Sequence, residues 1–239
     1  RLTRGGPPAG TMRRCAPRPP TRAGGPCADC PGPVRWRGRR GHSFFSPPGG
    51  LYLSILLRPA FSTRQSPQIT ALAAVAAARA AEQLCGTPIQ IKWVNDLWKN
   101  GKKVCGILTE AAVDLESGML DYAVLGLGFN LVQPSGGWPK ELAAVAGSLF
   151  DSAPAPGAAR HWRQRFLNEF WALYHTGLRG SWLDDYRRRQ ALTGQHVTLI
   201  PNGRERAGPR CLALTMTAAC WCAVMATLPP QHSAVMRSA

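Results

Sequence analysis

The sequence is poor in acidic residues and lacks long apolar segments. It has 13 Asp and Glu residues against 29 Lys and Arg residues, which gives a formal net charge of +16 over 239 residues. No apolar run is long enough to span a bilayer as a helix, and the first residues do not resemble a signal peptide. We therefore expect a cytoplasmic protein with no membrane partner, of a length that suits one catalytic domain plus a small appendage.

The excess positive charge is shared between the two ends and the middle of the chain. Residues 1–36 hold seven Arg and one Asp (+6), residues 37–206 hold twenty basic and twelve acidic residues (+8), and residues 207–239 add two Arg (+2). A basic surface is typical of nucleic-acid-binding proteins, so a basic nucleic-acid-binding module is one alternative. No DNA-binding domain is evident in the sequence.

The two ends also lack regular patterning. Residues 1–36 are rich in Arg, Pro, Gly and Cys without helical or strand periodicity, and residues 207–239 lose the alternation that precedes them. We predict that both are irregular, residues 1–36 being disordered or frame-shifted and residues 207–239 being translated in a shifted reading frame. The alternative is a zinc site built from Cys27-x-x-Cys30 and Cys220-x-Cys222, but this spacing without a His pair suits zinc poorly.

A β-hairpin is predicted at Asn100-Gly101, because both residues tolerate the positive φ of a tight turn. Lys92 and Lys103 would then lie on neighbouring strands or at their ends. Two ammonium groups brought together repel each other unless an anion, or carboxylates such as Asp96, lie among them. A phosphate-bearing ligand suits this grouping, whereas the alternative is a solvated basic hairpin.

Two glycine-containing segments carry further polar features. Residues 37–41 (Arg-Gly-Arg-Arg-Gly) combine a free backbone with guanidinium groups that bind phosphate or carboxylate oxygens, and they also suit a solvated or RNA-contacting loop. In the apolar run 124–131, Gly126 and Gly128 leave one strand face open to a planar ring. Asn130 at its end offers the donors and the acceptor that match an adenine edge. The alternative is a strand whose glycines serve close packing.

The middle of the chain predicts an α+β fold. Ser66 and Pro67 begin a helix that Gly86 ends. The other predicted elements are strands near 51–57, 89–93, 103–113 and 120–131, and helices near 140–149, 159–175 and 181–191. The last helix, with Asp184-Asp185 beside three arginines, is predicted to be exposed and to form charge pairs along its surface.

These segments, taken together, resemble the biotin protein ligases. The resemblance rests on residues 37–47 (RGRRGHSFFSP), 92–97 (KWVNDL), 103–108 (KVCGIL) and 126–130 (GLGFN). It implies a catalytic domain over residues 37–192 with a mixed β-sheet and helices, related to class II aminoacyl-tRNA synthetases and lipoate ligases. Residues 193–206 resemble the start of a small SH3-like C-terminal barrel.

The resemblance implies an ATP-dependent ligase that converts biotin and ATP to biotinyl-5′-AMP and transfers biotin to a lysine of a carboxylase carrier domain. It makes Lys103, Arg39 and Asp96 the catalytic residues, with Asp96 also binding Mg²⁺. Arginine, lysine and Mg²⁺ stabilise the charge that builds on the α-phosphate, and Asp96 is hypothesised to help deprotonate the carrier lysine. The residues implied to bind biotin or ATP are Arg37, Gly38, Arg39, Arg40, Phe44, Lys92, Asn95, Lys103, Gly106, Leu108, Gly126, Gly128 and Asn130.

The sequence departs from the family pattern near the N-terminal end. It has no Ser-Thr-Asn biotin-contacting segment, and Pro33, Trp36 and Phe44 stand where the family usually has glutamine, glycine and tryptophan. An inactive or damaged ligase-derived chain is therefore a second alternative. A lipoate–protein ligase is the third, being the nearest enzymatic neighbour.

Overall fold

The computed structural model describes residues 45–59, 62–177 and 180–194, except for the side chain of Arg64. Outside these ranges it describes the backbone of short strands. These are β1 (Cys27–Asp29), β2 (Trp36–Arg37), β3 (Ser43–Phe44), β9 (His196–Pro201), β10 (Arg206–Arg210), β11 (Ala213–Leu214), β12 (Cys222–Ala223) and β13 (Ala234–Ser238). Gly38, Arg39 and Arg40 lie outside the described residues.

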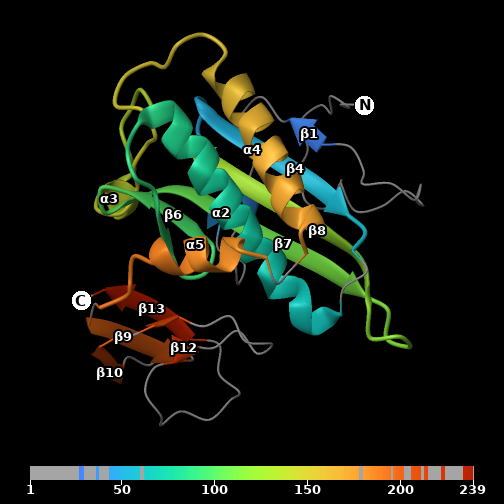
Figure 1. Ribbon diagram of the computed structural model, residues 1–239. Helices are drawn as coiled ribbons and strands as arrows, with labels where there is room; N and C mark the ends of the chain where they lie inside the picture. The colour runs from blue at the N-terminus through green and yellow to red at the C-terminus, as the bar shows by residue number, and fades with distance from the viewer. Residues whose placement is uncertain are drawn as a thin grey trace.

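A six-stranded sheet forms the centre of the molecule, in the order β1-β4-β8-β7-β6-β5 (Figure 1). Its further strands are β4 (Gly50–Leu57), β5 (Gln90–Lys92), β6 (Asp96–Lys99), β7 (Lys102–Val113) and β8 (Leu120–Asn130). All pairings between these named strands are antiparallel. Parallel pairing occurs in isolated bridges, Ile91 with Gln190 and Lys103 with Ala146.

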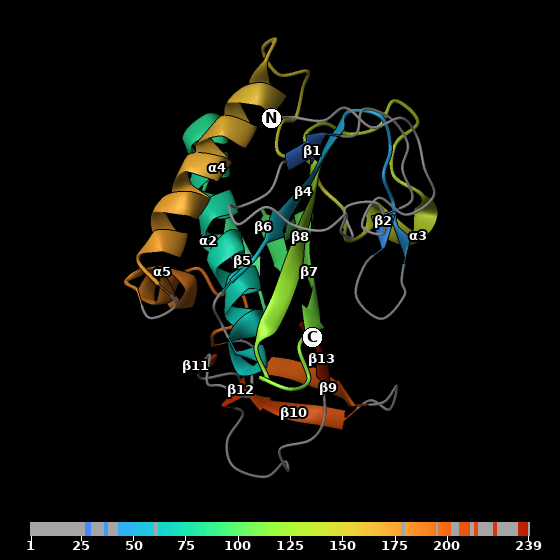
Figure 2. The same ribbon diagram turned by 90° about the vertical axis from the view of Figure 1, so that its right-hand side faces the viewer.

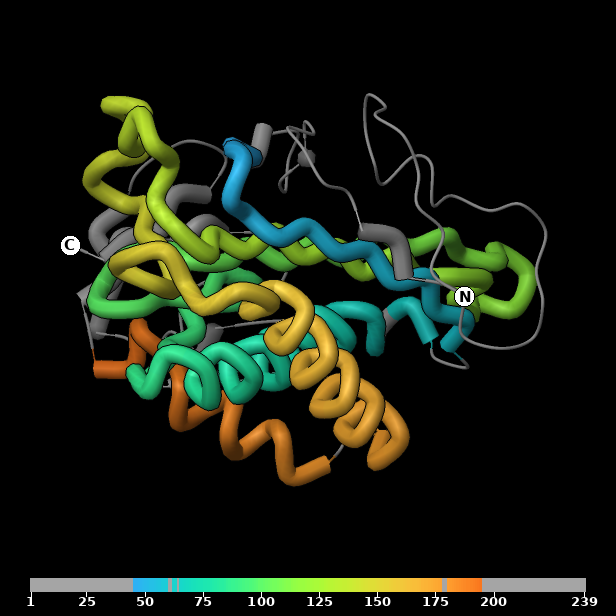
Figure 3. Tube along the Cα trace, turned by 90° about the horizontal axis from the view of Figure 1, so that it is seen from above, coloured from blue at the N-terminus to red at the C-terminus, as the bar shows by residue number. Residues whose placement is uncertain are grey.

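The helices cover one face of this sheet. Figures 2 and 3 show α2 (Ser66–Cys85), α4 (Ala158–His175) and α5 (Trp182–Arg188) together on one side of the strands, with the short α3 (Lys140–Ala143) elsewhere. A 3-10 turn, η2 (Thr63–Gln65), precedes α2. The α+β fold class predicted from the sequence is therefore confirmed.

The hydrophobic core lies between that sheet face and the helices. Alternate strand residues point into it, because successive side chains of a strand face opposite sides. The helix α2 is rich in buried alanines, which let it approach the sheet closely, and it ends at Gly86 in the left-handed conformation (φ 65°). Three aromatic side chains of α4, Trp162, Phe166 and Phe170, are fully buried in the same core, and Trp171 and Tyr174 pack against it partly buried.

The predicted hairpin is confirmed, with β6 ending at Lys99 and β7 beginning at Lys102 around Asn100 (φ 51°) and Gly101 (φ 74°). Two helix predictions were too long. The helix expected over 140–149 ends at Ala143, and the one expected over 181–191 spans Trp182–Arg188. In the first case the chain leaves the helix to pair with the start of β7, since Gly147 donates to the Lys103 carbonyl (2.8 Å).

The C-terminal segment forms short strands separate from the large sheet. Strand β9, predicted as the opening of a barrel, pairs with β10 and β13, and β11 pairs with β12. Strands are thus present within residues 207–239, which were predicted to be irregular, while the SH3-like barrel and the shifted reading frame stay predictions. None of the helices in the described part of the chain is both long and apolar enough to cross a membrane.

Candidate functional site

The sheet face opposite the helices carries the cluster of predicted site residues. Asp96, Gly106, Gly128 and Tyr52 lie opposite one another in four successive strands, β6, β7, β8 and β4. Their chain neighbours on these strands, such as Leu97, Phe129 and Leu53, belong to the core on the helix side. The row Asp96–Gly106–Gly128–Tyr52 therefore faces away from the helices.

A second row lies beside the first on the same face. Leu108 pairs with Gly126, which pairs with Ser54 of β4. The glycines at 106, 126 and 128 place bare backbone in the middle of both rows, bordered by larger side chains. The structure thus brings together four residues predicted to bind the ligand on one face of the sheet. Gly126 and Gly128 are buried there, and the binding of a planar ring against them stays a prediction.

Two charged residues of the site, Lys103 and Asp96, form an ion pair. Lys103 Nζ lies 2.8 Å from Asp96 Oδ1, and both side chains are partly exposed. The expectation that Lys92 and Lys103 lie on neighbouring strands was wrong, because β6 lies between β5 and β7. The Lys92 ammonium instead lies over the Trp98 ring, 4.3 Å from its centroid.

The backbone of Lys103 is held from three directions. Its N–H donates to the Val145 carbonyl (2.7 Å), and its carbonyl accepts from the Gly147 N–H (2.8 Å). The buried Asn130 amide donates from Nδ2 to the carbonyls of Gly147 (3.0 Å) and Lys103 (3.5 Å). These contacts fix the position from which the Lys103 side chain reaches Asp96.

Asn95 and Asn130, both predicted near the nucleotide, use their amide donors within the protein. Asn95 Nδ2 donates to the Ile107 carbonyl (2.9 Å), while Ile107 N–H donates to the Asn95 carbonyl (2.8 Å). Asn130 Oδ1 is buried and has no hydrogen-bond partner among the described residues. Asn130 therefore retains one acceptor for a ligand, whereas its donors support Lys103.

The hairpin lysines are not simply solvated. Lys99 is 8% exposed, and its ammonium donates to the Leu149 carbonyl (2.9 Å). Lys102 donates to the carbonyls of Ala143 (3.0 Å) and Ala144 (2.7 Å), which satisfies the end of α3. Both lysines border a hollow of about 560 Å³ beside the hairpin, which the two glycine rows do not line.

Tyr52 and Ser54 were not predicted as site residues. Tyr52 is buried, its hydroxyl donates to the Pro47 carbonyl (3.1 Å), and burial raises the pKa of its phenol to about 12. The signal was present in the sequence, because residues 51–57 alternate and put Tyr52 and Ser54 on the face opposite Leu53 and Ile55. Arg37 and Phe44 are described as backbone within β2 and β3, which pair with each other.

The described residues contain no group of three or more His, Cys, Asp or Glu side chains that could hold a metal ion. A lone carboxylate such as Asp96 still fits Mg²⁺, because this ion is usually bound by one or two carboxylates together with substrate phosphates and water. The proposed zinc alternative rests on cysteines whose side chains lie outside the described residues. Cys105, by contrast, is fully buried, as expected of a core residue.

The site combines the ion pair of Lys103 and Asp96 with three glycines of the sheet, Gly106, Gly126 and Gly128, which we call the glycine floor. The fold and the site thus define an α+β protein with a lysine–carboxylate pair beside a glycine floor on an antiparallel sheet. Residues 33–130 match the model of the biotin/lipoate A/B protein ligase family. This match covers 98 of the 239 residues, and it shows what this segment is similar to.

Proteins of similar sequence include two bacterial ligases. The chain is 39% identical over 118 residues to the bifunctional ligase/repressor BirA of Bacillus subtilis, a match that covers 49% of this chain and 36% of that protein. It is also 39% identical over 98 residues to the biotin–[acetyl-CoA-carboxylase] ligase of Paracoccus denitrificans, covering 40% of each. The matches thus span well under half the length of these relatives.

Solved structures of similar fold include the biotin protein ligase from Aquifex aeolicus in complex with biotin and ATP. It superimposes with a TM-score of 0.76 at 19% identity, covering 100% of this chain and 99% of that one. The crystal structure of a biotin protein ligase-like protein from Silicibacter covers 90% of this chain with a TM-score of 0.64 at 15% identity. At these identities the likeness establishes the fold.

Proposed function

We propose that the chain is a biotin–protein ligase. It would join biotin and ATP to biotinyl-5′-AMP and then transfer the biotinyl group to a lysine of a carboxylase carrier domain. The observation that carries the proposal is the ion pair of Lys103 and Asp96 at the end of a glycine floor, in a chain whose matched relatives are biotin ligases. The glycine floor suits a ring system, and the ion pair suits its reacting carboxylate and phosphate.

In the first reaction a carboxylate oxygen of biotin attacks the α-phosphate of ATP, and pyrophosphate leaves. Negative charge builds on the phosphoryl oxygens, so a fixed ammonium group near them lowers the barrier. Lys103 is suited to this task because its backbone is hydrogen-bonded to Val145 and Gly147 and its ammonium is oriented by Asp96. Arg39 and its neighbours are proposed to cover the same phosphate.

In the second reaction the uncharged amine of a carrier lysine attacks the biotinyl carbonyl, and AMP leaves. The lysine must first lose a proton, and Asp96 is the carboxylate we propose as acceptor. Asp96 is also the residue proposed to bind Mg²⁺ together with the phosphates. When bound, Mg²⁺ neutralises phosphate charge during the first reaction.

The test replaces Lys103 with Gln in the full chain. We expect Lys103→Gln to slow formation of biotinyl-5′-AMP by about 100-fold or more, the scale seen when a group that stabilises transition-state charge is removed. Release of pyrophosphate that depends on biotin measures this step. Lys140→Gln is the matched control, since Lys140 is an exposed lysine on α3, and it should leave the rate unchanged.

A wild-type chain that releases no biotin-dependent pyrophosphate and labels no carrier domain would contradict the proposal. Retention of that chain on nucleic acid at physiological salt would then favour the basic binding module instead.

A further inference from the structure

Ser54 has a buried hydroxyl group that nothing in the described structure satisfies. Its side chain is 1% exposed, and its Oγ has no hydrogen-bond partner among the described residues. Buried hydroxyl groups are normally hydrogen-bonded, so this one needs an explanation. The position of Ser54 supplies one.

Ser54 lies in the second row of the candidate site. It is directly opposite Gly126, and Gly126 is opposite Leu108. The neighbouring row holds Tyr52 on the same strand and Gly128 beside Gly126. Because Gly126 has no side chain, a ring lying on the glycine floor would come within reach of the Ser54 hydroxyl.

We infer that Ser54 is a specificity-determining residue that hydrogen-bonds a polar atom in the ring system of the ligand. The inference rests on the proposed function, in which the ligand is biotin. The ring system of biotin carries a ureido group with two N–H donors and a carbonyl acceptor, whereas the dithiolane ring of lipoate carries only two sulfur atoms. A buried hydroxyl that is satisfied by one ligand and not by the other discriminates between them.

The test compares the dissociation constants of biotin and lipoic acid by calorimetry for the full wild-type chain and for Ser54→Ala. We expect Ser54→Ala to weaken biotin binding about tenfold, as for loss of one hydrogen bond, with little change for lipoic acid. The preference for biotin should therefore fall by about the same factor. The unfolding temperature of the free variant should not be lowered, because the hydroxyl that it removes has no hydrogen-bond partner among the residues that the structure describes.

Thr109→Val is the matched control. It also removes a hydroxyl from the large sheet, but Thr109 Oγ1 lies 2.7 Å from Thr70 Oγ1 of α2, on the face that the helices cover. We expect Thr109→Val to lower the unfolding temperature and to leave the ratio of the two dissociation constants unchanged.

Two results overturn the inference, and they are distinguishable. If wild type binds biotin and Ser54→Ala shows the same ratio of dissociation constants, Ser54 does not set specificity, while the proposed function stands. If wild type binds lipoic acid in preference to biotin, or binds neither, the proposed function fails and the inference fails with it.

Discussion

At the scale of single residues, the Tyr52 ring lies over the backbone of Gly50 beside the glycine floor. A β-carbon added at Gly50 would come within 2.7 Å of Tyr52 Cζ, closer than such carbon atoms approach in real proteins. The buried ring would have to move, and with it the hydroxyl that donates to the Pro47 carbonyl. Gly50 is therefore fixed by the side chain two residues later.

We expect Gly50→Ala to lower the free energy of unfolding by about 1–3 kcal/mol, the usual cost of forcing extra atoms into a packed site. Denaturant unfolding measures this loss, and biotin binding should weaken as Tyr52 shifts. Gly136→Ala is the control, because a β-carbon at Gly136 meets no atom within 4 Å. Equal stability of the two variants would show that the Tyr52 ring is free to move.

The site residues differ in how far the sequence could predict them. Gly106, Gly126, Gly128 and Asp96 follow from family motifs, and strand alternation places them on one face. That Asn130 supports Lys103 could not be predicted, because it depends on Gly147 folding back onto the start of β7. Such contacts depend on the path of a loop, which a local sequence pattern does not encode.

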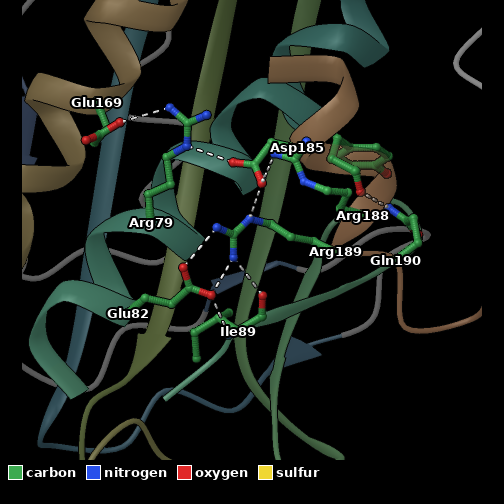
Figure 4. Close-up of polar contacts among 9 residues, drawn as sticks. Arg79, Glu82, Ile89, Glu169, Asp185, Arg188, Arg189 and Gln190 are labelled. Carbon is green, nitrogen blue, oxygen red and sulfur yellow. Dashed lines mark hydrogen bonds and ion pairs between the residues drawn. The ribbon is translucent and has the colours of Figure 1, made fainter. Parts of the chain in front are cut away.

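At the scale of elements, the helix α5 is attached to α2 by ion pairs around one buried carboxylate. Asp185 of α5, which is 6% exposed, accepts from Arg79 Nε of α2 (2.8 Å) and from Arg189 Nε (3.0 Å). Figure 4 shows Arg189 reaching on to both carboxylate oxygens of Glu82, and one of these oxygens also accepts from the Ile89 N–H (2.8 Å). The prediction of an exposed helix was therefore wrong for Asp185, although Asp184 does pair with Arg187 on the surface.

The reason for this error is physical. Charge pairs at i,i+3 and i,i+4 are the local pattern of an exposed helix, and Asp185 with Arg188 and Arg189 fits that pattern. Arg79, which pairs with the buried Asp185, lies more than one hundred residues earlier in the chain, so no local pattern indicates it. By contrast, the Asn100-Gly101 hairpin depends on two adjacent residues and was predicted correctly.

We expect Asp185→Asn to lower the free energy of unfolding by about 1.5–3 kcal/mol, because it removes the buried carboxylate that accepts from the partly buried guanidinium groups of Arg79 and Arg189. Asp184→Asn, the neighbouring control, should cost at most about 0.5 kcal/mol, since its pair with Arg187 is exposed. Urea unfolding at neutral pH compares the two variants. Similar losses for both would contradict a buried role for Asp185.

The difference in stability between wild type and Asp185→Asn is expected to depend on pH. Burial raises the pKa of Asp185, but the hydrogen bond from Arg79 and the charges of Arg189, Arg79 and Arg188 outweigh it and hold the pKa below its usual value. The stabilisation is then present above the pKa of the unfolded state, about 4, and is lost as the pH falls through the folded value. The stability gap between wild type and Asp185→Asn should narrow under acidic conditions.

At the scale of the whole molecule, the large sheet and its helices have the fold of solved biotin protein ligases, while the first 36 residues lack a motif that the family resemblance requires. The sheet edge next to β4 is taken by the short strand β1. The sequence has no Ser-Thr-Asn segment, and Pro33 stands in the place of a glutamine. Polar contacts to the biotin ring that those residues would make are therefore missing from the sequence.

The test replaces residues 1–36 with a family-type segment that contains Ser-Thr-Asn and the glutamine. We expect this restored version to bind biotin more tightly. Each hydrogen bond regained contributes about 1 kcal/mol, so two or three should lower the KM for biotin by about 30-fold or more. The rate at saturating biotin should change less, because Lys103 and Asp96 are the same in both versions. Initial rates of carrier labelling over a range of biotin concentrations separate the two effects. An unchanged KM would mean that the present chain already satisfies the biotin ring by other groups, and labelling by the restored version alone would identify the present chain as a damaged ligase.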